Sequence, residues 1–374
     1  MTPSLDHTAF PQLFDSIFAA LDHAGLLAMR GTSRDNCRRA DAELFKHVVA
    51  ERVLEREFAA DFDPLFFKFS DPDGMPLPLP LLQVYDLANI EKPKWRPKIR
   101  KRRVAELLGR TRVLDADLRS FSRMPALRLP NLEYVRVLGL SPKRISREYE
   151  VPPADTIVIF SPYIPAHAPT FRTTYHPGAP TSATKVIVHF CESQTWLHAT
   201  LNRNGFSESW FEISNIVITV SSLFSSTQYR YAADFRRTMY WAWVLDRFAK
   251  HLEAFVSRVC SGSNNLKSFT IVGLRASLQA TFNRHGHHND LRQPPALSLN
   301  DLVDHRFWPR CPDGLPGTLS ILSLVVNNER VKCLSLDEYM ADLSPQERLH
   351  ELVPPTRRSV RRTPSIASDS SDEE

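Results

Sequence analysis

The segment Ala183-Thr-Lys-Val-Ile-Val-His-Phe-Cys191 decides the fold class of this chain. It is a short run of β-branched and aromatic residues, which suit the pleated, buried surface of a β-strand. Comparable runs recur along most of the chain, at Thr111–Asp115, Leu132–Leu138, Asp155–Phe160, Ser214–Val220, Leu266–Val272 and Leu319–Val326. The stretches between them are long enough for crossover connections, which place consecutive strands parallel to one another. The sequence therefore predicts an α/β fold around a parallel sheet.

The spacing of these runs indicates repeats. The centres Val113, Val135, Val158, Ile187 and Val217 are separated by 22, 23, 29 and 30 residues, close to the period of leucine-rich repeats. The stretch Leu129-x-x-Leu132-x-x-Val135-x-Val137 resembles the core of that repeat. The resemblance implies that Val135 and Val137 point inward and that Tyr134 and Arg136 face solvent.

The later strands are apolar on both faces. Thr156–Phe160 and Asn215–Val220 show this pattern, which is typical of a parallel sheet covered on both sides. We therefore predict an irregular leucine-rich-repeat-like β/α body, and a doubly wound α/β body is the alternative.

Composition favours a packed protein in a reducing compartment. The chain has 374 residues, of which 43% are hydrophobic, and a formal net charge of +5, so two or more domains are expected. Its five cysteines lie far apart with no C-x-x-C spacing, which favours free thiols over disulfides or a zinc site. Neither a secretory signal nor an apolar run of about 20 residues is evident. We expect a nuclear or cytoplasmic protein that does not enter a membrane.

Short helices are predicted over residues 8–59. Apolar residues recur there at three- and four-residue intervals, beginning with Pro11, Leu13, Phe14, Ile17, Phe18 and Leu21. Gly25 ends the first helix, and Leu26, Leu27 and Met29 mark a second. A third helix is predicted from about Asp41 to Phe58.

This helical segment resembles the F-box. The resemblance rests on Phe10-Pro11-Gln12-Leu13, Ile17-Phe18, Leu21, Leu26-Leu27-Ala28-Met29-Arg30 and Ser33-Arg34. Phe10 stands where the family has leucine, and Asn36 stands where it has tryptophan. F-box proteins dock the Skp adaptor of cullin–RING ubiquitin ligases. The resemblance implies that adaptor contacts are made by Pro11, Leu13, Phe14, Ile17, Leu26 and Leu27. The alternative is an N-terminal helical cap on the α/β body.

A proline-rich and basic linker is predicted over residues 60–103. Its last part, Lys92 to Arg103, holds eight basic residues in twelve: Lys92, Lys94, Arg96, Lys98, Arg100, Lys101, Arg102 and Arg103. Such a run suits a nuclear localisation signal, a solvated surface or a nucleic-acid patch. The run contains one aromatic residue, Trp95, which is weak support for nucleic-acid binding.

Residues 104–353 are predicted to form the α/β domain. Ala233–Cys260 is its longest helical pattern, with one broad apolar face suited to packing across the sheet. Near the end, Ser335 with Glu338 and Ser344 with Glu347 fit capping boxes, and Pro345 suits a first helical position. Residues 354–374 are predicted to be a disordered tail. Thr363, Ser370 and Ser371 lie there in phosphorylation contexts.

No pattern in the sequence supports catalysis. Gly205–Ser209 resembles a nucleophile elbow, but Ser209 replaces the second glycine and no strand directly precedes it. The histidines of His285-Gly-His287-His288 have no fitting cysteine or carboxylate ligands nearby. We therefore expect no enzyme and no catalytic, cofactor or metal residue. The sequence favours an F-box-like substrate receptor that links an unidentified protein target to a Skp–cullin ligase, and a nuclear scaffold without a ligase role is the alternative.

Overall fold

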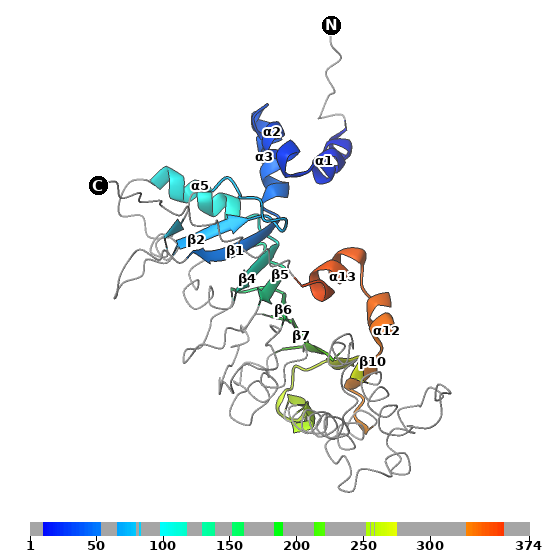
Figure 1. The fold of residues 1–374 in the computed structure, drawn as a ribbon. Coiled ribbons are helices and arrows are strands. Elements are labelled where there is room, and N and C mark those ends of the chain that lie inside the picture. The colour runs from blue at the N-terminus through cyan, green and yellow to red at the C-terminus, as the bar shows by residue number, and fades with distance from the viewer. Residues whose placement is uncertain are drawn as a thin grey trace, which may run out of the picture.

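The computed structural model describes residues 10–53, 66–79, 82–83, 98–117, 129–138, 152–160, 183–189, 213–220, 252–254, 256–257, 259–274 and 327–354. Three short helices stand at one end of a long, mostly parallel sheet, and two further helices lie beside its middle (Figure 1). This arrangement confirms the predicted α/β class.

The N-terminal helices are α1 (Pro11–Ala20), α2 (His23–Arg30) and α3 (Arg34–Leu44). The Asp22 side chain caps α2 by accepting a hydrogen bond from the amide of Gly25 at 2.8 Å, and Ser33 caps α3 by accepting from Asn36. The predicted third helix from Asp41 to Phe58 is wrong in its extent, because α3 ends at Leu44 and residues 47–53 form strand β1 (His47–Val53). The apolar spacing there fits both periods, and pairing with neighbouring strands selects the extended form.

One ten-stranded sheet contains all the strands of the described residues. The remaining strands are β2 (Phe66–Ser70), β3 (Leu82–Gln83), β4 (Val113–Asp117), β5 (Tyr134–Leu138), β6 (Thr156–Phe160), β7 (Lys185–His189), β8 (Asn215–Thr219), β9 (Ser268–Val272) and β10 (Val331–Leu334). Their order is β10-β9-β8-β7-β6-β5-β4-β1-β2-β3. β1 and the strands from β4 to β10 run parallel, and β2 and β3 are antiparallel.

Consecutive strands from β4 to β10 are also neighbours in the sheet. The direction changes once, at β1, because β2 and β3 extend the sheet on one side of β1 and β4 follows on the other. A doubly wound sheet also reverses its strand order at a switch point, but here the described strands β2 and β3, on one side of the reversal, are antiparallel. The six predicted strands from Thr111–Asp115 to Leu266–Val272 are confirmed, whereas Leu319–Val326 lies outside the described residues. β2 and β3 correct the expectation that residues 60–103 are a linker throughout.

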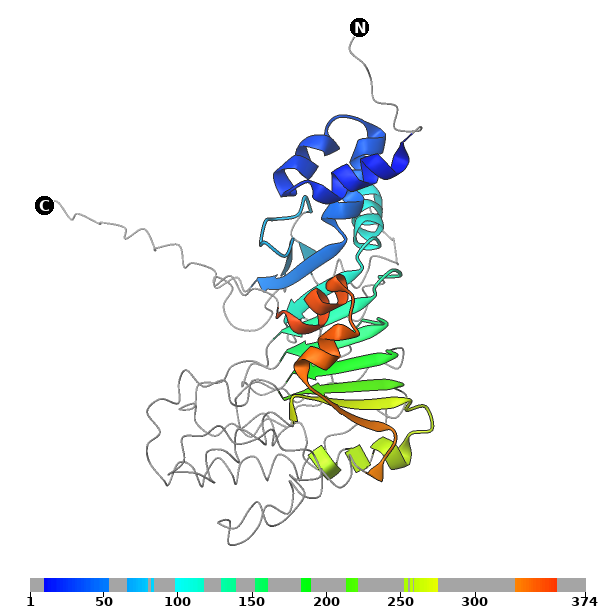
Figure 2. The same ribbon diagram turned by 90° about the vertical axis from the view of Figure 1, so that its right-hand side faces the viewer.

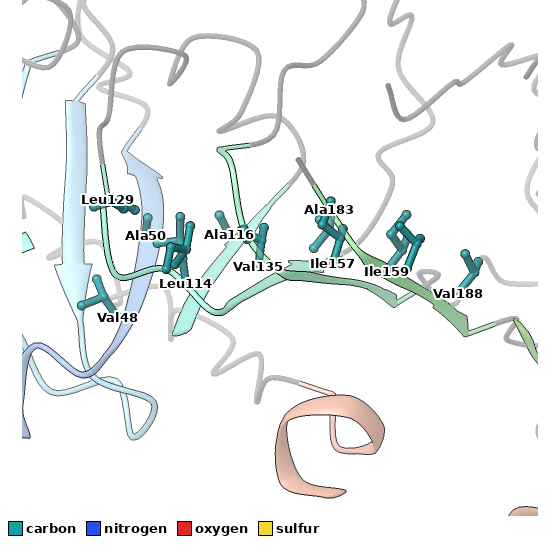
Figure 3. Close-up of a cluster of buried hydrophobic side chains, with 14 of the residues drawn as sticks. Val48, Ala50, Leu114, Ala116, Leu129, Val135, Ile157, Ile159, Ala183 and Val188 are labelled. Atoms are coloured by element: carbon teal, nitrogen blue, oxygen red, sulfur yellow. The ribbon is translucent and has the colours of Figure 1, made fainter. Parts of the chain in front are cut away.

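The first face of the sheet is lined by aligned ladders of aliphatic side chains. Val135, Ile157, Val186, Ile216 and Phe269 stand side by side in consecutive strands and are buried. Figure 3 shows that the side chains of this face point away from the helix on the other side of the strands. The same core includes apolar residues of α5 (Lys98–Leu108) and of the helical residues between 252 and 262. That helical stretch confirms the end of the helix predicted over Ala233–Cys260.

The second face is covered by α12 (Leu336–Ala341) and α13 (Pro345–Leu352), which cross in front of the strands in Figure 2. Tyr339 and Leu343 pack there against Val158, Ile187 and Val217. Both predicted capping boxes are confirmed, with Pro345 at the start of α13. This segment, residues 335–354, is called the strap below.

A buried carboxylate joins the N-terminal helices to the body. Asp41 of α3 is fully buried and accepts hydrogen bonds at 2.5 Å from Arg30 of α2 and from Arg103 of α5. Nearby, Arg110 donates to the carbonyl of Arg38. Because apolar residues of α1, α2 and α3 share one core cluster with the sheet, the helices form one packed unit with the body.

Replacing Asp41 with alanine is expected to lower the free energy of unfolding by about 2–3 kcal/mol, because two charge-assisted hydrogen bonds are lost at a buried position. Urea unfolding of the full chain measures this. Asp35→Ala is the matched control, since Asp35 is exposed and pairs with Arg38 at 3.6 Å. Its expected effect is about 0.5 kcal/mol or less. Equal effects of the two substitutions would contradict a joining role for Asp41.

Candidate functional site

Apolar side chains face solvent on α1 and α2. The exposed fraction is 61% for Phe10, 50% for Leu13, 41% for Ile17 and 39% for Leu27. Phe10, Leu13 and Ile17 are three and four residues apart, so they lie along one side of α1. These four residues are called the outward face below.

The opposite side of α1 packs inward. Phe18 is buried, and Phe14 and Leu21 pack against the core. Helix α1 is therefore apolar on two sides, whereas a helix that only caps a body needs one apolar stripe. Pro11 occupies the first turn of α1, where its missing N–H leaves no hydrogen bond unmade.

The structure divides the six predicted adaptor contacts. Pro11, Leu13, Ile17 and Leu27 are exposed, Phe14 is partly buried, and Leu26 is buried in the core. Leu26 therefore serves packing. The sequence analysis did not select Phe10 as a contact, although its position next to Pro11 at the start of the helix was a usable signal.

Asn36, at the position of the family's tryptophan, serves the start of α3. Its amide donates to the Ser33 hydroxyl, and its side-chain amide donates to the Thr32 hydroxyl at 2.8 Å. The residue thus closes a local turn.

The basic run is divided by the structure. Lys92, Lys94 and Arg96 lie outside the described residues, while Lys98, Arg100, Lys101, Arg102 and Arg103 belong to α5. Arg102 pairs with Glu106 at 3.2 Å, and Arg103 is bound to Asp41. Thr363, Ser370, Ser371, the segment Gly205–Ser209 and the histidines from His285 to His288 lie outside the described residues.

A second candidate site is the polar cluster beneath the strap, centred on Glu351. This buried carboxylate accepts from Lys185 of β7 and from the hydroxyl of Tyr339, each at 2.6 Å. The ring of His189, on the second face at the end of β7, is hydrogen-bonded through Nε2 to the carbonyl of Glu351 and through Nδ1 to the hydroxyl of Thr219. Because a carbonyl only accepts, Nε2 carries the proton and Nδ1 accepts.

Arg136 makes the companion contact. Its guanidinium donates to the carbonyl of Val353, the C-cap residue of α13. The same guanidinium lies 3.4 Å from Asp115 on the neighbouring strand, and both side chains are almost fully buried. Burial lowers the pKa of Arg136, and the charge of Asp115 opposes that shift. The expectation that Tyr134 and Arg136 face solvent is therefore wrong, because the strap covers this face.

His350 of α13 is buried between the strap and the sheet without a described hydrogen bond. Among the residues that the structure describes, neither of its ring nitrogens has a partner. Its ring lies against those of Tyr134 and His47, with centroids 5.1 and 5.7 Å away. Burial, then the nearby charges of His47 and Arg136, lower the pKa of His350 to about 4. Burial likewise lowers the pKa of His189 to about 4.

The chain matches no family model, and comparisons with curated proteins and with solved structures give no similar protein. Within the described parts of the chain, no group of histidine, cysteine and acidic side chains is arranged to hold a metal ion. The same parts contain no helix long and apolar enough to cross a membrane. Functional inference therefore rests on the outward face and on the cluster beneath the strap.

Acid is expected to destabilise the fold through the two buried histidines, His189 and His350. Each has a folded-state pKa of about 4, below the unfolded value of about 6.5. The unfolded chain therefore binds more protons, so their stabilisation is complete above pH 6.5 and is lost as pH falls towards 4. His350→Phe should reduce this loss of unfolding free energy at low pH. It should change the free energy of unfolding little at pH 7, since it removes no described hydrogen bond. Urea unfolding between pH 7 and 4 measures both. An unchanged pH dependence of stability in the His350→Phe variant would contradict the lowered pKa of His350 in the folded protein.

Proposed function

We propose that this protein is an F-box-like substrate receptor, in which the outward face binds the Skp adaptor of a cullin–RING ubiquitin ligase and the body binds a protein target. The supporting observation is the exposure of Leu13, Ile17 and Leu27, three of the positions that the family resemblance assigns to adaptor contact.

Burial energetics favour an interface role for the outward face. Covering a leucine or isoleucine side chain yields about 1.5–3 kcal/mol when burial is complete. Polar residues at these positions would leave α1 packed equally well, because Phe14 and Phe18 make its contacts with the core. An adaptor that covers the outward face accounts for apolar residues on the solvent side.

The junction at Asp41 suits this role. A receptor must hold its target at a fixed distance from the ligase, and rigid packing between adaptor module and body provides that. Arg39 of α3 also pairs with Asp15 of α1, which fixes the helix that carries most of the outward face. The body contributes binding and positioning, and the chemistry belongs to the other subunits of the ligase.

Co-purification of the full chain with a purified Skp adaptor tests the proposal. The wild type should bind, and an Ile17→Asp, Leu27→Asp double variant should lose binding at least 10-fold, because two charges would be buried at the contact. Both positions are exposed, so circular dichroism should show an unchanged fold and melting temperature.

Leu349→Asp is the matched control. Leu349 is 51% exposed on α13, so it tests the same chemical change on the strap, away from the outward face. The control should bind the adaptor as the wild type does. Absence of binding by the wild type, or equal loss in the control, would overturn the proposal.

A further inference from the structure

The strap has the properties of a ligand bound to the second face. Each of its helices has a complete capping box within its own sequence, so each is specified locally. The strap follows β10, which is an edge strand. The first-face core contains no strap residue. Removing the strap from its place would therefore leave every strand pair intact.

Polar groups of the sheet bind the end of α13. The last carbonyls of a helix have no partners within the helix, and the sheet supplies donors for two of them. His189 binds the carbonyl of Glu351, and Arg136 binds that of Val353. Lys185 adds an ion pair to the Glu351 side chain. The second face thus recognises a helix C-terminus together with a glutamate in its last turn.

The apolar part of the second face makes it unfavourable to remove the strap without a replacement. Val158, Ile187 and Val217 are at most 4% exposed beneath the strap, and uncovering them costs about 25 cal/mol for each Å² of apolar surface. Water could replace the polar contacts but not the apolar ones. Another helix that offers the same groups could replace both. Exchange of occupants is therefore favoured over an empty face.

We propose that the strap is an internal ligand of the second face, and that a partner protein displaces it with an amphipathic helix that ends in exposed carbonyls and carries a glutamate in its last turn. The partner helix places apolar side chains on Val158, Ile187 and Val217, and its carboxylate on Lys185. Arg136 and His189 bind its terminal carbonyls. Displacement of the strap involves neither α1 nor α2, so it can hold or fail independently of adaptor binding.

A peptide of residues 335–354, labelled with a fluorophore, tests the proposal against the full chain. Glu351→Ala in the chain should weaken its own strap, so this variant should bind the wild-type peptide at least 10-fold more tightly than the wild-type chain does. A peptide with Glu351→Ala should bind the variant chain at least 10-fold more weakly than the wild-type peptide, because it offers Lys185 no carboxylate. Glu329→Ala, at an exposed acidic residue just before β10, is the chain control and should bind as the wild type does.

Hydrogen exchange distinguishes a loosened strap from a destabilised fold. In the Glu351→Ala chain, amides of residues 335–354 should exchange at least 10-fold faster than in the wild type, and amides of β5 to β8 should be unchanged. If strap and strands exchange together in both proteins, the strap is an inseparable part of the fold and the proposal is overturned. Failure of the peptide to bind the loosened chain would also overturn it.

Discussion

Everything in this structure depends on the need to cover a parallel sheet on both sides. Its central strands carry aliphatic residues on each face, as in Thr156–Phe160, where all five residues are buried. Among the described residues, the first face is covered by α5, which precedes β4, and by the helical residues between 252 and 262, which precede β9. The second face is covered, among the described residues, by the strap that follows β10. The segment after the last strand must return to close it.

That return explains the polar groups on the second face. A helix whose C-terminal end packs on the strands brings unpaired carbonyls into a buried environment. Each of these carbonyls needs a hydrogen-bond donor there. Arg136 and His189 meet this need, and Asp115 and Thr219 in turn bind those two side chains. The cluster is therefore a consequence of docking a helix C-terminus on the sheet. A cluster of this kind holds the strap in one register, because only one position satisfies all its members.

The sequence predicts the sheet well and its cover poorly, for physical reasons. Strands β6 and β8 are readable because apolar residues on both faces mark them locally. The sequence predicts a helix over β1 because the spacing of Leu44, Phe45 and Val48 suits a helical face, and pairing with β2 and β4 decides otherwise. The repeat resemblance places Arg136 in solvent, because a local pattern cannot show what covers a face. Its partner Val353 lies 217 residues away in sequence. At the candidate interface, periodicity predicts the apolar side of α1, but on α2 it does not separate Leu26, which packs inward, from Leu27, which faces out.

The outward face and the second face differ in what covers them, and this contrast separates their roles. The outward face is apolar and uncovered, which suits a permanent or high-affinity partner that shields it from water. The second face is occupied, and its polar groups are paired with the strap. A partner there must compete with the strap, which has a high local concentration because Ser335 follows directly on Leu334 of β10. Such competition requires a high affinity from the partner helix. A helix is therefore bound only when it offers both the apolar side chains and the glutamate that the strap offers. Selectivity would then come from the strap, because every weak binder loses to it.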